Sequence, residues 1–250
     1  MKRFLGILFA MAALCAALLG CAASAEETDW TWEEQPDGTA VITGYSGETD
    51  TVTIPAEIGG KRVSGIADAA FAGSTGFTDV TVPGTVARIG NAAFAGIATL
   101  KTVTVEQGVE EIGSEAFIDC PNLTAVTLPE SGVTGVGEKA FAYCYQLETV
   151  NLPSGIAEVP AKMFWECRNL TAIVIPEGVT SIENMTFSST GITRYYLPKS
   201  LTYVFGGDLD NGHGNLIEII YAGSEEDWNN IFHPSPEDWG WRIGSITFLE

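Results

Sequence analysis

The chain has 250 residues, a length that suits one or two compact domains or a single elongated repeat domain with caps. Hydrophobic residues make up 46% and charged residues 18%, a composition that excludes an intrinsically disordered chain. Thirty-two acidic residues face 12 Lys and Arg, and the net charge of −20 repels phosphate backbones, which argues against nucleic-acid binding.

The first 20 residues have the pattern of an export signal. Lys2 and Arg3 precede an apolar run over residues 4–19, which is shorter than the roughly 20 residues that a bilayer-spanning helix needs. The run ends in Leu-Leu-Gly directly before Cys21, and this sequence resembles a lipobox. The resemblance implies cleavage before Cys21 and acylation of that cysteine.

Two alternatives to the lipoprotein signal remain open. Ala-Ser-Ala, ending at Ala25, fits the small-x-small rule of ordinary signal cleavage and predicts a secreted chain. The second alternative is that the N-terminal segment is not cleaved and serves as a membrane anchor. The favoured arrangement is a lipoprotein signal over residues 1–20 and a tether over residues 21–29, with membrane contact only through lipid on Cys21.

Residues 30–55 are predicted to form an N-terminal hairpin cap. Asp37-Gly38 is a dipeptide typical of tight turns, and it separates two strand-like segments at residues 30–34 and 39–45. We expect this hairpin to cover the first coil of the repeat region that follows.

A repeat of about 23 residues organises residues 56–205. A phenylalanine recurs at intervals of 23 residues, with one interval of 24, at Phe71, Phe94, Phe117, Phe141, Phe164 and Phe187. An aliphatic residue stands five positions before each of them, at Ile66, Ile89, Ile112, Val136, Val159 and Ile182. Downstream of four of the phenylalanines comes a phrase of the form L-x-x-V/I-x-V/L/I, which begins at Leu100, Leu123, Leu147 and Leu170 and is usually followed by proline. Variants of the phrase that begin at Phe77 and Ile192 open and close the series. Such self-similarity is typical of a solenoid.

The phrases predict the structure of one coil. Apolar residues two apart lie on the same face of a strand, so the V-x-L pair is expected to point into a core. Small residues between Ile and Phe suggest a compact helical turn on the opposite side. A lone coil has about seven apolar positions, worth roughly 1.5–3 kcal/mol each when buried, against roughly 1–2 kcal/mol for ordering each residue. Coils must therefore stack, which pairs their strands into one parallel sheet.

Residues 206–250 are predicted to form a C-terminal cap. Ser224 is a good helix N-cap, and the three acids that follow it favour the positive end of a helix dipole. We expect Trp228, Trp239 and Trp241 to shield the end of the stack.

The repeat resembles a leucine-rich repeat, and its fuller phrase I-G-x-x-A-F-x-x-C-x-x-L-T-x-V-x-L-P resembles the BspA-like branch of that family. Residues 112–129 carry this phrase almost unchanged, and the resemblance extends over about residues 35–232. It implies an α/β solenoid of six to seven coils, with a parallel β-sheet and short helical turns. It also implies a bacterial surface or secreted protein that adheres to other proteins.

Residues for catalysis, metal binding or cofactor binding are not found in a convincing pattern. His213 and His233 lie in loop-like sequence without a partner nucleophile, and we expect no catalytic residue, no metal and no cofactor. Cys120, Cys144 and Cys167 occupy one column of successive coils. They are expected to be core thiols, although one disulfide between two of them, or less readily zinc, remains possible from the sequence.

A partner is expected on surfaces made by equivalent positions of successive coils. The outward strand position carries threonine in the early coils and then Asn151, Val174 and Tyr196. Two positions before Tyr196 stands Arg194, and Tyr and Arg are typical of binding hot spots. A second cluster is predicted from Tyr143, Tyr145 and Trp165, which either cover the turns or form a contact patch.

These observations favour a non-catalytic module for protein binding or adhesion, displayed outside the cytoplasm and lipid-anchored at the bacterial cell surface. Its partner would be a host, matrix or envelope protein. An envelope scaffold of the producing cell is the alternative, and a hydrolase that uses carboxylates on the strand face is the least favoured.

Overall fold

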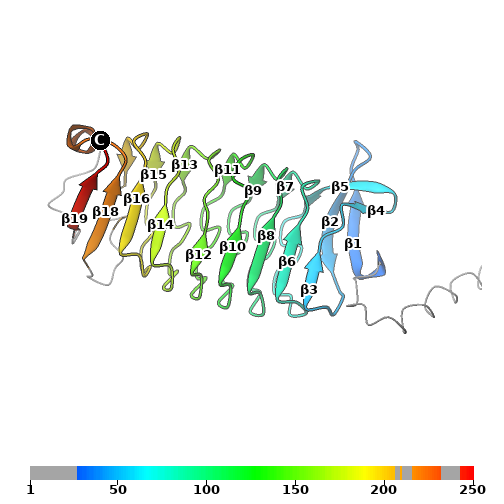
Figure 1. The fold of residues 1–250 in the computed structure, drawn as a ribbon. Helices are drawn as coiled ribbons and strands as arrows, with labels where there is room; N and C mark the ends of the chain where they lie inside the picture. Colours follow the sequence, from blue (N-terminus) through cyan, green and yellow to red (C-terminus); the bar gives the residue numbers. More distant parts are fainter. Residues whose placement is uncertain (1–26, 206–208, 210–215, 232–242) are drawn as a thin grey trace, which may run out of the picture.

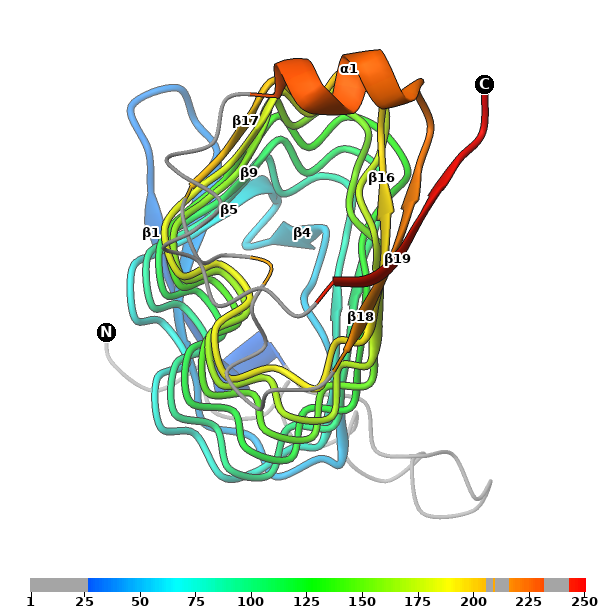
Figure 2. The same cartoon turned by 90° about the vertical axis from the view of Figure 1, so that its left-hand side faces the viewer.

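The computed structural model describes residues 27–205, 209, 216–231 and 243–250, in which the chain winds into a β-solenoid of about eight turns (Figure 1). Each regular turn contributes one strand to each of two rows of parallel strands, which lie on different sides of the coil (Figure 2). The expected parallel-sheet solenoid is confirmed. The count exceeds the expected six to seven coils because the turns through β3 and β18 lack the phenylalanine phrase.

The longer strands form a row whose outer surface we call the strand face. Its first sheet has the order β12-β10-β8-β6-β3 and its second sheet the order β14-β16-β18-β19. In chain order these strands are β3 (Thr51–Thr53), β6 (Asp79–Val82), β8 (Thr102–Val105), β10 (Ala125–Thr127), β12 (Thr149–Val150), β14 (Ala172–Val174), β16 (Arg194–Leu197), β18 (Ile217–Tyr221) and β19 (Ile243–Phe248).

The other row, whose outer surface we call the back face, is made mostly of two-residue strands. Its sheets have the orders β1-β2-β5-β7-β9-β11, with β4 beside β5, and β13-β15-β17. The strands are β1 (Trp30–Glu34), β2 (Ala40–Tyr45), β4 (Glu57–Ile58), β5 (Lys61–Ile66), β7 (Arg88–Ile89), β9 (Glu111–Ile112), β11 (Gly135–Val136), β13 (Glu158–Val159), β15 (Ser181–Ile182) and β17 (Tyr203–Val204).

The repeated apolar residues fill the space between the two rows, as their spacing predicts. All six repeat phenylalanines are at most 1% exposed, and their rings stack in one continuous column. Adjacent ring centroids are 4.7 to 5.9 Å apart, with interplanar angles below 10°. This column and the inward strand residues form one core along the whole solenoid.

The segments expected to be short helical turns have a different structure. The residues two before and two after each repeat phenylalanine have positive φ, as at Glu115 (60°) and Asp119 (55°) around Phe117. Turn N–H groups alternate between the next coil, as from Phe117 to the carbonyl of Ala140 (2.8 Å), and a residue three positions earlier in their own coil, as from Ile118 to the carbonyl of Glu115 (3.0 Å). Left-handed residues and inter-coil bonds both preclude a helix. The aliphatic residue before each turn lies in or beside a back-face strand.

Both ends of the core are closed by aromatic residues. The predicted hairpin is confirmed as β1 and β2, which pair antiparallel, and its Trp30 packs 6.2 Å from the first repeat ring, Phe71. At the other end Tyr195 lies 5.5 Å from Phe187, and Tyr221 in turn packs against Trp228. Trp239 and Trp241 lie outside the described residues.

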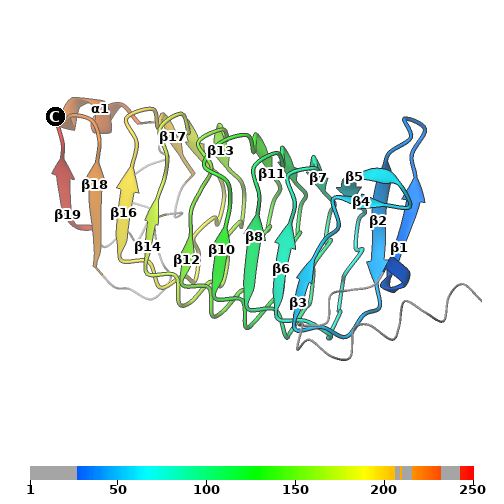
Figure 3. The ribbon, with the colours of Figure 1, turned by 45° about the vertical axis from the view of Figure 1, so that its right-hand side comes forward.

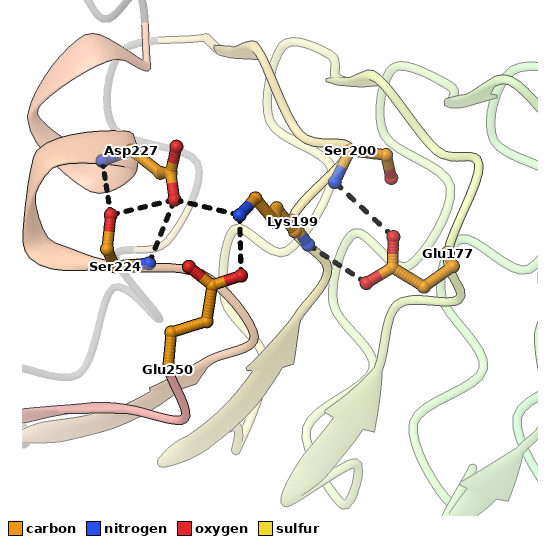
Figure 4. Close-up of polar contacts among 6 residues, drawn as sticks. All are labelled: Glu177, Lys199, Ser200, Ser224, Asp227 and Glu250. Carbon is orange, nitrogen blue, oxygen red and sulfur yellow. Dashed lines mark hydrogen bonds and ion pairs between the residues drawn. The ribbon is translucent and has the colours of Figure 1, made fainter.

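The single α-helix of the described residues is α1 (Glu225–Asn230), which lies beside the end of the solenoid (Figure 3). Its predicted N-cap is confirmed, because Ser224 Oγ accepts a hydrogen bond from Asp227 N (3.1 Å) in a capping box. Hydrogen bonds from Ser224 lower the pKa of Asp227. Lys199 Nζ forms ion pairs with Asp227 of α1 (3.3 Å) and with Glu250 (2.5 Å), and so connects three segments at this end of the solenoid (Figure 4).

Candidate partner-binding surface

The outward positions of the strand face change in character along the solenoid. Through β6, β8 and β10 they are mainly threonine, which is a good strand former but offers little surface for a contact. From β14 onward the same column carries Val174, 61% exposed, and Tyr196, 36% exposed. The late coils therefore place large apolar side chains where the early coils place small polar ones.

Strand register brings the predicted contact residues together. Val174 pairs with Tyr196 and Tyr196 pairs with Ile220, so these side chains form an outward row across β14, β16 and β18. A second outward row contains Arg194 and Glu218, which form an ion pair (2.7 Å). The hydrogen bond with Glu218 raises the pKa of Arg194, which stays charged and held beside Tyr196.

Glu218 and Ile220 were not predicted from the sequence as members of this surface. The segment before them, residues 206–216, departs from the 23-residue spacing, so the repeat does not set the register of β18. The alternation in Ile217–Tyr221, with positions 217, 219 and 221 buried, is the signal that could have placed them.

Asn151 occupies the same column but has a different role. Its amide bonds both main-chain groups of the preceding coil: Leu128 N–H donates to Asn151 Oδ1 (3.0 Å), and Asn151 Nδ2 donates to the Leu128 carbonyl (2.6 Å). The side chain thus replaces part of a strand ladder, and its polar atoms already have internal partners.

The strand face is interrupted directly after Asn151. β12 and β14 belong to two separate sheets, and no pairing joins them in the described chain. A hollow of about 480 Å³ lies over this interruption, lined by residues 126–127, 148–151 and 171–174. It is continuous with Val174 and therefore adjoins the apolar row.

The second predicted cluster, which we call the aromatic edge, lies in the turns. Tyr143 is 4.9 Å from Trp165 and 6.2 Å from Tyr145, so the expected proximity is confirmed. Lys162 Nζ lies 5.2 Å from the Trp165 ring centroid, and the Arg168 guanidinium 5.1 Å from that of Tyr145. All three aromatic side chains are half-buried, and cations of the same chain cover two of them.

The cysteine column holds free thiols, which answers the question that the sequence left open. Each Sγ donates to a phenylalanine carbonyl of the preceding coil, as from Cys120 to Phe94 O (3.1 Å) and from Cys144 to Phe117 O (3.2 Å). Burial raises the pKa of Cys120 to about 12. The thiols are core groups that satisfy backbone carbonyls.

The described residues contain no group of three or more His, Cys, Asp or Glu side chains arranged to hold a metal ion. None of their helices has the length and apolar character needed to cross a membrane. Cys21, Ala25, His213 and His233 fall outside this part of the chain.

Residues 64–193, about half of the chain, match six copies of the BspA type leucine rich repeat region. The chain belongs to this family of leucine-rich-repeat solenoids. Its structure is similar to that of a leucine-rich-repeat protein of T. pallidum, with 26% identity, a TM-score of 0.64, and coverage of 80% of this chain and 86% of that one.

Two further solved structures resemble parts of the chain. A leucine-rich-repeat protein of Bacteroides ovatus is 23% identical with a TM-score of 0.49, covering 82% of this chain and 65% of that one. A leucine rich cell surface protein of Faecalibacterium prausnitzii is 20% identical with a TM-score of 0.37, covering 86% and 99%. No curated protein matches the sequence.

Proposed function

We propose that this chain is a non-catalytic protein-binding or adhesion module that acts outside the cytoplasm, and that its partner binds the late strand face. The observation that carries the proposal is the row formed by Val174, Tyr196 and Ile220 on three adjacent strands. Solenoids bind partners along such equivalent positions. Apolar side chains that are exposed side by side point to a binding site, whereas apolar residues scattered singly over a surface are ordinary.

The chemistry of the row suits a protein partner. Tyr196 offers a large, rigid ring with a polar tip, a combination that is enriched at protein interfaces. The neighbouring Arg194–Glu218 pair supplies both a donor and an acceptor at the rim. A charged rim around an apolar centre is the usual anatomy of a protein–protein interface.

Display outside the cytoplasm follows in this proposal from the N-terminal segment. Acylation of Cys21 would tether the solenoid to a membrane through residues 21–29, followed by the hairpin cap (30–55), the repeats (56–205) and the C-terminal cap (206–250). Cleavage after Ala25 would release it instead. Metabolic labelling with a fatty acid distinguishes these outcomes. A label on the native chain that disappears in Cys21→Ser supports the lipid anchor. A native chain without label refutes the lipid anchor.

The binding proposal is tested by capture of host and matrix proteins on the purified full chain. We expect Tyr196→Ala combined with Arg194→Ala to weaken capture at least tenfold, because truncating interface residues of these types often costs about 2 kcal/mol or more each. The matched control is Thr81→Ala with Thr104→Ala, at the same column in earlier coils and outside the hollow, which is expected to leave capture unchanged.

Three results would contradict the proposal. Equal capture by both double variants would remove the late strand face as the site. Loss of capture in Trp165→Ala alone would move the site to the aromatic edge. Capture restricted to envelope proteins of the producing cell would replace adhesion by a scaffold role.

A further inference from the structure

The interruption between β12 and β14 leaves main-chain groups without a strand partner. In regular coils the N–H of an inward residue donates to the carbonyl of the outward residue one coil later, as from Ile54 to Thr81 (3.0 Å) and from Ile175 to Tyr196 (2.9 Å). The equivalent bond, from Leu152 N–H to the Val174 carbonyl, is not formed between these two described residues. β14 thus has an open edge in the middle of the strand face.

Asn151 lies at the interruption. Its amide occupies the N–H and C=O of Leu128 in the preceding coil, and β12 is only two residues long. Val150 beside it is only half-buried, whereas the equivalent residues Val126 and Ile173 are 3% and 2% exposed. The hollow therefore combines an open strand edge with exposed apolar surface.

The hollow also carries a negative charge, which favours a partner with a positive charge. Glu148 is the one charged residue of its lining, is exposed, and has no ion-pair partner among the described residues. The chain as a whole carries a net charge of −20, so a cationic partner is favoured both at long range and at the rim.

From these features we infer that the hollow binds an extended peptide segment that carries a basic side chain, a deepening that rests on the proposed function. The peptide main chain supplies the alternating donors and acceptors that an open strand edge pairs with. The basic side chain meets Glu148, and an apolar side chain covers Val150 and Val174. A volume of about 480 Å³ lies within the ordinary range of ligand sites and suits a few side chains.

The test uses a library of random linear heptapeptides displayed on phage, selected on the purified full chain. Enriched sequences are expected to contain Lys or Arg together with an aliphatic or aromatic residue. Their synthetic peptides should bind Glu148→Gln at least fivefold more weakly than the native chain, and Val174→Thr likewise. The matched control, Glu158→Gln, removes the same charge from the back face and should stay within twofold.

A second readout separates strand pairing from simple adhesion to the surface. Backbone amide exchange at residues 172 and 174, measured by NMR, should slow at least tenfold when a selected peptide is bound, since these N–H groups face the open edge. No enriched sequence, equal binding to Glu148→Gln and Glu158→Gln, or unchanged exchange would each overturn the inference. If the inference fails while Tyr196→Ala with Arg194→Ala still abolishes protein capture, the proposed function stands without it.

Discussion

Replacing Phe117 with alanine removes a central ring from the stacked column of the core. Phe117 is fully buried, and its ring centroid lies 5.1 Å from that of Phe94 and 5.4 Å from that of Phe141. The interplanar angles are 2° and 6°, so the ring contacts a parallel neighbour on each side. Both neighbours lose a packing surface in the variant.

The expected cost follows from the burial and the two contacts. A buried Phe→Ala change typically costs about 3–5 kcal/mol, because burial energy is lost and a cavity remains. Each aromatic pair adds roughly 0.5–1.5 kcal/mol beyond burial, which places Phe117 toward the upper end of that range. Phe205→Ala is the matched control, since this side chain is 37% exposed and its loss should cost less than about 1 kcal/mol.

The assay is equilibrium unfolding of the full chain in guanidinium, followed by circular dichroism. A fall in the free energy of unfolding with an unchanged denaturant slope indicates that neighbouring coils still unfold together. If Phe117→Ala lowers the free energy of unfolding no more than Phe205→Ala does, the stacked rings do not stabilise the core. The explanation of stability by stacked coils is then wrong.

Three further predictions concern single groups. The three core thiols should resist maleimide at pH 8 in peptide-level mass spectrometry until the chain unfolds, because burial raises their pKa, to about 12 for Cys120. Lys199→Met removes two ion pairs and should accelerate amide exchange in α1 while leaving β8 unchanged. Hydrogen bonds from Thr102 and Thr78 lower the pKa of Asp79, so its contribution to stability is present above the usual value of 3.8 and is lost as the pH falls through the lowered one. Asp79→Asn should therefore destabilise the chain at pH 7, and the difference in urea midpoint should shrink under strong acid.

Much of the fold is readable from the sequence because the repeat records the same physical requirement six times. Each coil must bury one phenylalanine and two inward strand residues, so both the 23-residue spacing and the core were predictable. The structure of the turns was not predictable, because a pattern of apolar and small residues does not indicate whether φ is positive or negative. Ordinary residues such as Glu115 and Lys139 adopt left-handed conformations there, at a cost that inter-coil hydrogen bonds offset.

The candidate site was predictable in part for the same reason. The spacing places Val174, Tyr196 and Arg194 on one face, and the pairing of Val174 with Tyr196 across adjacent strands follows from it. Ile220 was missed because the spacing fails before β18. The hollow was missed because the repeat spacing continues unchanged through β12 and β14, so it predicts a continuous sheet where the structure has two separate sheets.

The most direct test of the account is a map of amide exchange across the whole chain, free and bound to a captured partner. If the partner binds the late strand face, exchange should slow on binding at residues 172–174, 194–196 and 217–220, with little change on the back face. Protection confined to back-face strands such as β7 and β9 would contradict it, because the partner would then ignore the late strand face.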